Sequence, residues 1–369
     1  MILRKLAALI CVAVALGATA AQRDEHYTMA DFEKLRKFDA HVHANTPDHI
    51  FLDVAGQDNF ELLSINVDYP DFPTLHEQAE VAHALQAADP ARFHFATTFS
   101  MQGFGSTDWV PATNQRINEE FARGALAVKV WKNIGMVEKD AAGKKIMLDD
   151  KGFDGVMANI EAHGKALIAH QAEPKNCWLP LDQMTTENDR SYFRDHPEYY
   201  MFLHPEEPSY EALIAARDRF LARHPRLDFV GAHMGSLEWS VDELARFLDR
   251  FPNASVDLAA RMTQVQHQSV RDYQKVRRFF IRYQNRLMYG SDLSEDPPDP
   301  GARAQNPPVT QQSFSDEADQ FWRSDWKYLA TDESQHIDAI KADAPGLALP
   351  RAVIDKIYYG NARRVFHLR

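Results

Sequence analysis

The chain contains very little cysteine for its length. Its 369 residues include two, Cys11 and Cys177. Cys11 lies in an N-terminal apolar run that we expect to be removed, so the mature chain would keep Cys177 alone and could form no internal disulfide. No residue next to Cys177 in the sequence would serve as a dedicated base for its thiol. We therefore interpret Cys177 as a structural residue.

Basic runs are also absent. The chain carries 41 Lys and Arg against 53 Asp and Glu, which gives a net charge of −12. Nucleic acids and anionic membranes bind clustered cationic side chains, so both are poor candidates as partners. A small-molecule substrate is the partner class that remains, and the sequence leaves homo-oligomer formation open.

No apolar run is long enough for a permanent transmembrane helix. Arg4 and Lys5 precede the short apolar stretch 6–16, and Ala18-Thr19-Ala20 fits a small-residue cleavage site. We expect residues 1–20 to be a cleaved signal peptide, so that 21–369 is exported, to the periplasm, without a stable membrane anchor. The alternative is an uncleaved anchor.

Strand-like and helix-like segments alternate from residue 37 onward. The predicted helices cover residues 74–88, 114–123, 154–163, 210–223, 241–251, 270–284, 350–358 and 362–367. The predicted strands cover residues 37–44, 61–67, 93–99, 125–131, 166–170, 227–232, 254–259 and 287–290. Eight such strands are the number that closes a (β/α)8 TIM-type barrel, and no linker divides the segment, so we predict one α/β domain. An open doubly wound sheet would need a phosphate-cradling glycine loop after its first strand, and none is there.

Two connections are much longer than a barrel requires. Residues 172–208 follow the fifth strand, and residues 293 to about 312 follow the eighth. Both leave the C-terminal ends of strands, which is the face where barrel enzymes carry their sites. Loops of this length are typical of lids and binding loops, so we predict that 172–208 is a lid. Disorder is the alternative for the second, Pro-rich connection.

The first strand carries two histidines, His41 and His43. Phe38, Ala40 and Val42 alternate with them as a predicted buried face. Residues two apart on a strand share a face, with Cα atoms roughly 6.6 Å apart. Two imidazoles in this arrangement can bind one divalent metal ion.

Other polar residues lie at or near the ends of later strands: Lys129 in the fourth, His170 after the fifth, His233 after the sixth and Asp292 after the eighth. Buried polar groups are costly unless they are paired or bind a metal. Their convergence at one barrel mouth therefore predicts a metal site. Three or four His and Asp ligands suit zinc or a similar divalent ion with an open coordination position.

This ordered set resembles the amidohydrolase superfamily. More narrowly, it resembles the amidohydrolase-related branch that includes aminocarboxymuconate-semialdehyde decarboxylase and pyrone-dicarboxylate lactonase. The resemblance covers roughly residues 36 to 367, and it rests on His41-x-His43, His170, His233, Gly290-Ser291-Asp292 and the terminal Tyr359-Gly360-Asn361-Ala362-Arg363-Arg364-Val365-Phe366.

The resemblance implies a role for each site residue. One metal ion would be held by His41, His43, His170 and Asp292. His233 would orient or protonate the substrate, and Asp292 would also accept a proton from a water activated by the metal. Both are the predicted catalytic residues.

Lys129 has two readings in this family. Relatives with two metals use a carboxylated lysine on the fourth strand as a bridge, and His170 and His233 then bind the second ion. Relatives with one metal keep an ordinary lysine there. Because Trp131-Lys132-Asn133 departs from the His-Pro that commonly follows bridging lysines, we favour one metal.

Three further residues are weaker candidates for substrate binding. Glu173 follows the fifth strand, and either contacts a ligand or begins the lid. Arg261 follows the seventh strand, where its guanidinium would bind a carboxylate or form a salt bridge. Trp178 would wall an aromatic pocket or pack in the core.

The sequence supports a metal-dependent hydrolase of a small ester, lactone or amide. The alternative is non-oxidative decarboxylation of an aromatic or unsaturated acid in the same site, because the two chemistries share fold and ligands. A non-enzymatic binding protein is the third reading, and the combination of metal ligands with a base argues against it.

Overall fold

The computed structural model describes residues 26–297 and 311–368. The expected signal peptide, residues 1–20, lies outside the described residues, as does most of the Pro-rich connection. Within the described part, no helix combines the length and apolar character needed to cross a bilayer.

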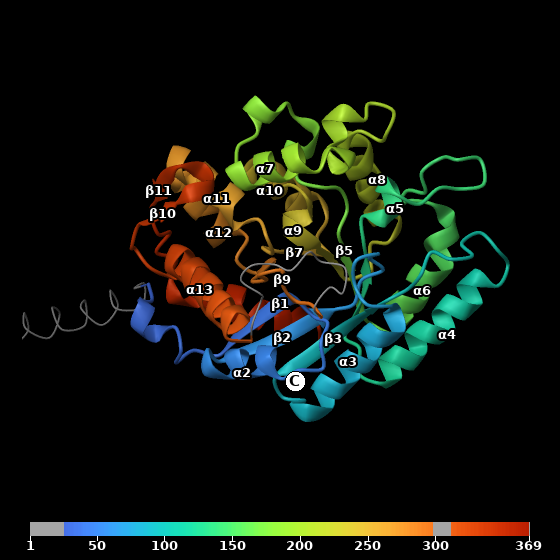
Figure 1. Ribbon diagram of the computed structural model, residues 1–369, viewed down its shortest axis with the longest axis horizontal. Helices are drawn as coiled ribbons and strands as arrows, with labels where there is room; N and C mark the ends of the chain where they lie inside the picture. The colour runs from blue at the N-terminus through green and yellow to red at the C-terminus, as the bar shows by residue number, and fades with distance from the viewer. Residues whose placement is uncertain (1–25, 298–310, 369) are drawn as a thin grey trace, which may run out of the picture.

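A curled parallel sheet forms the centre of the molecule (Figure 1). Its order, β8-β7-β6-β5-β4-β3-β2-β1-β9, places strands that are consecutive in the chain side by side. This is the arrangement of the predicted barrel. The strands are β1 (Lys37–Ala44), β2 (Phe60–Ile65), β3 (Phe93–Thr98), β4 (Ala127–Val130), β5 (Ala166–Ala169), β6 (Phe229–Gly231), β7 (Ala254–Asp257), β8 (Leu287–Met288) and β9 (Leu293–Glu295).

The eighth strand position is shared by β8 and β9. β8 pairs with β7, and β9 pairs with β1. Between them, the Tyr289 carbonyl accepts a hydrogen bond from the Ala40 N–H (2.9 Å), and the Asp292 N–H donates to the His41 carbonyl (2.8 Å). Backbone hydrogen bonds therefore join the last strand position to the first. The expectation of a loop from residue 293 is wrong, because β9 begins there.

Helices surround the sheet, and several begin at side-chain caps. Thr74 and Glu77 form a capping box at α3, while Ser209 and Ser240 accept backbone N–H groups at α8 and α10. The helices are α2 (Ile50–Gln57), α3 (Leu75–Ala88), α4 (Trp109–Ala122), α5 (Asn133–Met136), α6 (Asp154–Ala162), α7 (Glu187–Asp195), α8 (Tyr210–Arg223), α9 (Ala232–Gly235), α10 (Val241–Arg250), α11 (Met262–Arg271), α12 (Tyr273–Arg282), α13 (Gln311–Ala330), α14 (Arg351–Asp355) and α15 (Asn361–Val365).

Shorter elements complete the fold. A π-helical turn, η8 (Lys356–Gly360), joins α14 to α15, and β10 (Gln335–Ile337) pairs antiparallel with β11 (Ala342–Ala344). The 3-10 turns are η1 (Met29–Asp31), η2 (Lys151–Phe153), η3 (Lys175–Trp178), η4 (Leu181–Gln183), η5 (Pro197–Tyr199), η6 (Met201–Leu203) and η7 (Asp338–Ile340).

Several predicted helices differ from the structure. The predicted helix 270–284 corresponds to α12, which begins at Tyr273 because the Asp272 carboxylate accepts the Lys275 N–H. Residues 270 and 271 instead end α11, which begins at Met262 and was not predicted. The predicted helix from residue 114 already begins at Trp109. α13 was not predicted at all, although Phe314, Ala318 and Trp322 form a buried stripe at a spacing of four residues.

One apolar cluster lies inside the barrel, and a larger one lies on the outer face of the sheet. The larger cluster packs helices against the outer face of the sheet. Ala362, Val365 and Phe366 from the C-terminal end join the inner cluster, so the last helix covers the end where the strands begin. The strand residues of the inner cluster are Phe38, Ala40, Leu63, Ile65, Ala96, Ala127, Ala166, Ile168, Val230 and Met288.

A bulge in β1 turns both histidines into the barrel. The register of β1 with β2 shifts before Val42. Phe38 and Ala40 belong to the inner cluster, whereas Val42 belongs to the outer one. Because a bulge adds one residue, it reverses the alternation of side chains beyond it. The predicted common face of Phe38, Ala40 and Val42 is therefore wrong, and His41 and His43 point inward.

The buried carboxylate of Asp39 ties this seam to α13. Its Oδ1 accepts the backbone N–H groups of His41 (3.2 Å) and Ser291 (3.0 Å), and its Oδ2 accepts the Trp322 indole N–H (2.8 Å). Burial raises the pKa of Asp39 to about 6, although these donors oppose the rise. The carboxylate thus depends on its donors to remain ionised in the core.

Trp322→Phe should therefore lower the free energy of unfolding more than Trp326→Phe. Both indoles are fully buried on α13, but Trp326 donates to the neutral Thr28 carbonyl (3.1 Å). Losing a donor to a carboxylate costs about 1.5–3 kcal/mol, against about 0.5–1.5 kcal/mol for a neutral acceptor. Urea unfolding of both variants without metal measures the difference. Equal losses would contradict the role assigned to Asp39.

Candidate metal centre

Three side chains converge at the C-terminal mouth of the barrel. His41 and His43 come from β1, and Asp292 comes from the turn between β8 and β9. The Nε2 atoms of both histidines lie 3.3 Å from Asp292 Oδ1. The sequence predicted these three residues as metal ligands, and the fold brings them together.

Hydrogen bonds fix the orientation of both imidazoles. His41 Nδ1 lies 2.9 Å from Asp257 Oδ2, and His43 Nδ1 lies 2.8 Å from the Ile65 carbonyl oxygen. Each acceptor requires a proton on Nδ1, so in the neutral ring the lone pair is on Nε2. Burial lowers the pKa of His41, and Lys129 acts in the same direction. Both Nε2 lone pairs therefore face the Asp292 carboxylate.

This donor set fits a divalent cation. Two imidazole lone pairs and a carboxylate oxygen would repel one another without a positive charge between them. Burial alone would raise the pKa of Asp292, but positive charge on His233, His41 and His43 would outweigh it and hold the pKa well below its ordinary value, so a positive charge at this point stabilises the carboxylate. Ligand atoms about 2.0–2.2 Å from one ion lie roughly 3.0–3.5 Å apart, which matches the observed 3.3 Å.

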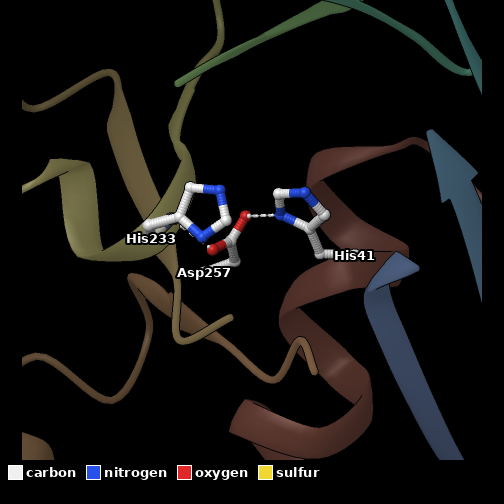
Figure 2. Close-up of side chains that lie close together, drawn as sticks. All are labelled: His41, His233 and Asp257. Atoms are coloured by element: carbon white, nitrogen blue, oxygen red, sulfur yellow. Dashed lines mark hydrogen bonds and ion pairs between the residues drawn. The ribbon is translucent and has the colours of Figure 1, made fainter. Parts of the chain in front are cut away.

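Asp257 is the residue that the sequence analysis missed. It ends β7 and is almost fully buried. Its second oxygen, Oδ1, accepts the backbone N–H of His233 (2.7 Å) and that of Ala259 (3.2 Å). Figure 2 shows this carboxylate between the imidazoles of His41 and His233. Because both oxygens are engaged, Asp257 supports the ligands from behind, as outer carboxylates do at metal sites. The available signal was a charged residue inside the predicted strand 254–259.

His233 is held in place by a left-handed turn. Residues 233–236 have φ angles of 56°, 59°, 62° and 57°. Arg217 donates to the Gly235 carbonyl, Tyr210 donates to the Ser236 carbonyl, and the Ser236 hydroxyl bonds back to the end of β5. Such a turn is unfavourable for residues other than glycine and persists only where its surroundings enforce it.

The turn leaves one imidazole nitrogen of His233 for a ligand. Its Nδ1 lies 3.0 Å from the Ala259 carbonyl oxygen and 4.0 Å from Asp292 Oδ2. Nδ1 is therefore occupied by the protein, and Nε2 is free to act in the cavity. Burial lowers the pKa of His233 well below its ordinary value.

His170 and Lys129 border the same cavity from β5 and β4. His170 lies outside the close group of three ligand atoms, but its buried Nε2 has no hydrogen-bond partner among the described residues. Lys129 Nζ lies 3.3 Å from His41 Nε2, and burial lowers its pKa to about 8. His170 is therefore placed for a further contact, and the ammonium of Lys129 is close enough to the ligand group to compete with a cation.

The three weaker candidates for substrate binding lie in different surroundings. Glu173 forms an ion pair with Lys132 above the metal ligands. Trp178 packs on Tyr210 and donates to the Pro208 carbonyl (3.3 Å), away from the site cavity. Arg261 does not line that cavity either, although its charge acts on His170 and His233. The structure thus presents the packed alternative for Trp178, and a contact between Arg261 and a substrate stays a prediction.

A cavity of about 240 Å³ opens over the ligands, and a second one of about 320 Å³ adjoins it. The segment 172–208 contributes much of the second wall, including Glu173, Tyr192 and Tyr199. In Figure 1 this segment, with α7, covers the upper side of the molecule. The segment thus borders the site, and its action as a lid stays a prediction.

A barrel with histidine and aspartate ligands at its C-terminal mouth defines a class of metal-dependent enzymes. The sequence model of the amidohydrolase family matches residues 38–368, and the chain belongs to this family. No curated protein sequence matches it significantly.

Solved structures share the fold at low identity. 2,6-Dihydroxybenzoate decarboxylase from Rhizobium has a TM-score of 0.50 and 15% identity, over 90% of this chain and 99% of that chain. The 2,6-dihydroxybenzoate decarboxylase complexed with 2,6-dihydroxybenzoate has a TM-score of 0.51 and 14% identity, with the same coverage. A probable 2-pyrone-4,6-dicarboxylic acid hydrolase from Acinetobacter baumannii has a TM-score of 0.47 and 12% identity, over 90% and 100% of the two chains. The two decarboxylase structures, with TM-scores of 0.50 and 0.51, support the barrel fold.

Asp257→Asn should weaken metal binding by about 10- to 100-fold. The asparagine oxygen can replace Oδ1 toward the backbone of His233, but its amide N–H would face His41 Nδ1 and favour the wrong tautomer. Competition with a chelator measures the affinity, and unfolding midpoints of the metal-free proteins check that the fold is kept. Unchanged affinity would show that Asp257 does not orient His41.

Proposed function

We propose that the protein is a metal-dependent hydrolase of a small ester, lactone or amide. The observation that carries this proposal is the convergence of His41 Nε2, His43 Nε2 and Asp292 Oδ1 beside an open cavity. A divalent ion bound there would polarise the substrate carbonyl and acidify a water molecule. We propose zinc, because two imidazoles and a carboxylate with an open position are typical of catalytic zinc sites.

Asp292 and His233 are the groups that would move protons. Asp292 is ionised and partly exposed at the cavity, so it can accept a proton from the attacking water. The Nδ1–H of neutral His233 donates to the Ala259 carbonyl, so Nε2 carries a lone pair and would first accept a proton. The imidazolium formed in this way would then bind the carbonyl oxygen or pass that proton to the leaving group. The left-handed turn would keep this imidazole beside Asp292 during the reaction, with Nδ1 4.0 Å from Asp292 Oδ2.

We propose one metal ion for each chain. The close group contains three ligand atoms, and His170 would supply a fourth contact. Lys129 would remain an ordinary cation. Metal analysis of the purified protein tests this number, and a ratio near two would move Lys129 and His233 into the metal shell.

Non-oxidative decarboxylation is the second candidate reaction. Lys129 and Lys132 both line the inner cavity, and although Lys132 is paired with Glu173, the ammonium group of Lys129 would favour a substrate carboxylate. In that reaction Asp292 or His233 would deliver the proton that replaces carbon dioxide.

A substrate panel separates the two reactions. Metal-loaded protein should hydrolyse at least one compound among small lactones, esters and amides, and should release no carbon dioxide from hydroxybenzoates. Loss of activity on chelation and its return with zinc would link the reaction to the site. Carbon dioxide release without any hydrolysis would replace the first proposal by the second.

His233→Asn and Asp292→Asn should each reduce turnover by at least about a hundred-fold, because loss of a general acid or base typically costs a hundred- to ten-thousand-fold. His233→Asn should keep its metal, whereas Asp292→Asn should also bind metal more weakly. His76→Asn, on the exposed side of α3, is the matched control. Turnover and metal content are measured in the same samples. Near-normal turnover in metal-loaded His233→Asn would leave His233 a packing residue.

A further inference from the structure

The inner cavity adjoins the outer one. Tyr69, Trp131 and Lys132 line both cavities, so the two cavities meet at these residues. The inner cavity contains the metal ligands, and the outer cavity lies between them and the segment 172–208. A molecule that reacts at the inner cavity can therefore extend outward through the second one.

The outer cavity is lined largely by aromatic and thioether side chains. Tyr69 and Trp131 pack with ring centroids 4.7 Å apart at its inner end. Tyr192 and Tyr199 line the same cavity from the segment 172–208, and they remain 43% and 46% exposed. Aromatic side chains that stay partly exposed beside a cavity offer faces for a planar ligand group.

The charges of this outer wall are negative on balance. Glu173 is paired with Lys132, and Glu207 is paired with Lys145 (3.0 Å). Glu198 also lines the cavity and forms no ion pair with a described residue. An anionic group would be repelled by this unpaired carboxylate, whereas a neutral ring would not be repelled and could pack on the aromatic faces.

We infer that the outer cavity binds a neutral aromatic group at the non-reacting end of the substrate. The inference rests on the proposed function, since it places the oxygen-bearing, reacting end of the same molecule over His41, His43 and Asp292. The substrate class is then an aryl-substituted ester, lactone or amide that carries no second carboxylate. The segment 172–208 selects the substrate through Tyr192 and Glu198.

Hydroxamates test this assignment without requiring turnover, because the hydroxamate group binds divalent metals. Dissociation constants are measured by calorimetry on metal-loaded protein for acetohydroxamate, for 4-phenylbutyrohydroxamate and for its para-carboxy derivative. The phenyl compound should bind at least about tenfold more tightly than acetohydroxamate. The para-carboxy compound should lose most of that gain, and Glu198→Gln should restore it.

Tyr192→Ala should weaken the phenyl compound by about two- to tenfold and leave acetohydroxamate unchanged. Phe202→Ala is the matched control, because Phe202 is similarly exposed (46%) on the same segment but lines neither cavity. Equal affinities for the phenyl and methyl compounds would overturn the inference and leave the proposed function standing. Absence of acetohydroxamate binding would overturn the metal site itself, and the inference with it.

Discussion

The hydrogen-bonded seam between β1 and the β8–β9 strand position is the constraint on which the site depends. The bulge in β1 turns His41 and His43 toward the barrel axis. The same seam places Asp292 beside them, since its N–H bonds to the His41 carbonyl (2.8 Å). Two strands at opposite ends of the chain therefore supply one ligand set, and a slip of one residue between them would separate the imidazoles from the carboxylate.

Two buried carboxylates next to the seam hold the strands and the imidazoles of the site in position. Asp39 holds the backbone of both strands on the outer side, and Asp257 holds His41 and His233 on the inner side. Asp39 accepts three hydrogen bonds, and Asp257 accepts two from backbone N–H groups and lies in contact with the Nδ1 atom of His41. These contacts offset the cost of removing each charge from water. The metal ligands are thus the innermost part of a larger polar network.

The barrel could be predicted because its alternating strand-like and helix-like segments follow a simple periodicity, whereas the complete ligand set was implied by the resemblance to the amidohydrolase superfamily. Strands of alternating apolar residues repeat along the chain, and His41, His43, His170, His233 and Asp292 stand at or near their C-terminal ends. The bulge could not be predicted, because it depends on the register with β2 rather than on the residues of β1 alone. α13 follows a Pro-rich stretch, which is typical of an irregular connection, so the buried face of the helix is evident only once the fold is known.

The remaining differences have a similar origin. Asp257 is one ordinary aspartate in the sequence, and only the fold shows that it lies between two imidazoles. Trp178 and Arg261 were chosen for their chemistry, but packing on Tyr210 and a position outside the cavity determine what they contact. Residue type indicates the available chemistry, whereas tertiary contacts decide which residues reach the substrate.

The left-handed turn at residues 233–236 has a consequence for how the site responds to its substrate. Its three residues other than glycine cost about 3–6 kcal/mol relative to ordinary backbone conformations. That energy is supplied when the chain folds, by Arg217, Tyr210 and the surrounding core. The imidazole of His233 is consequently preorganised: it need not rearrange as charge develops during a reaction, and its surroundings remain the same in every catalytic cycle.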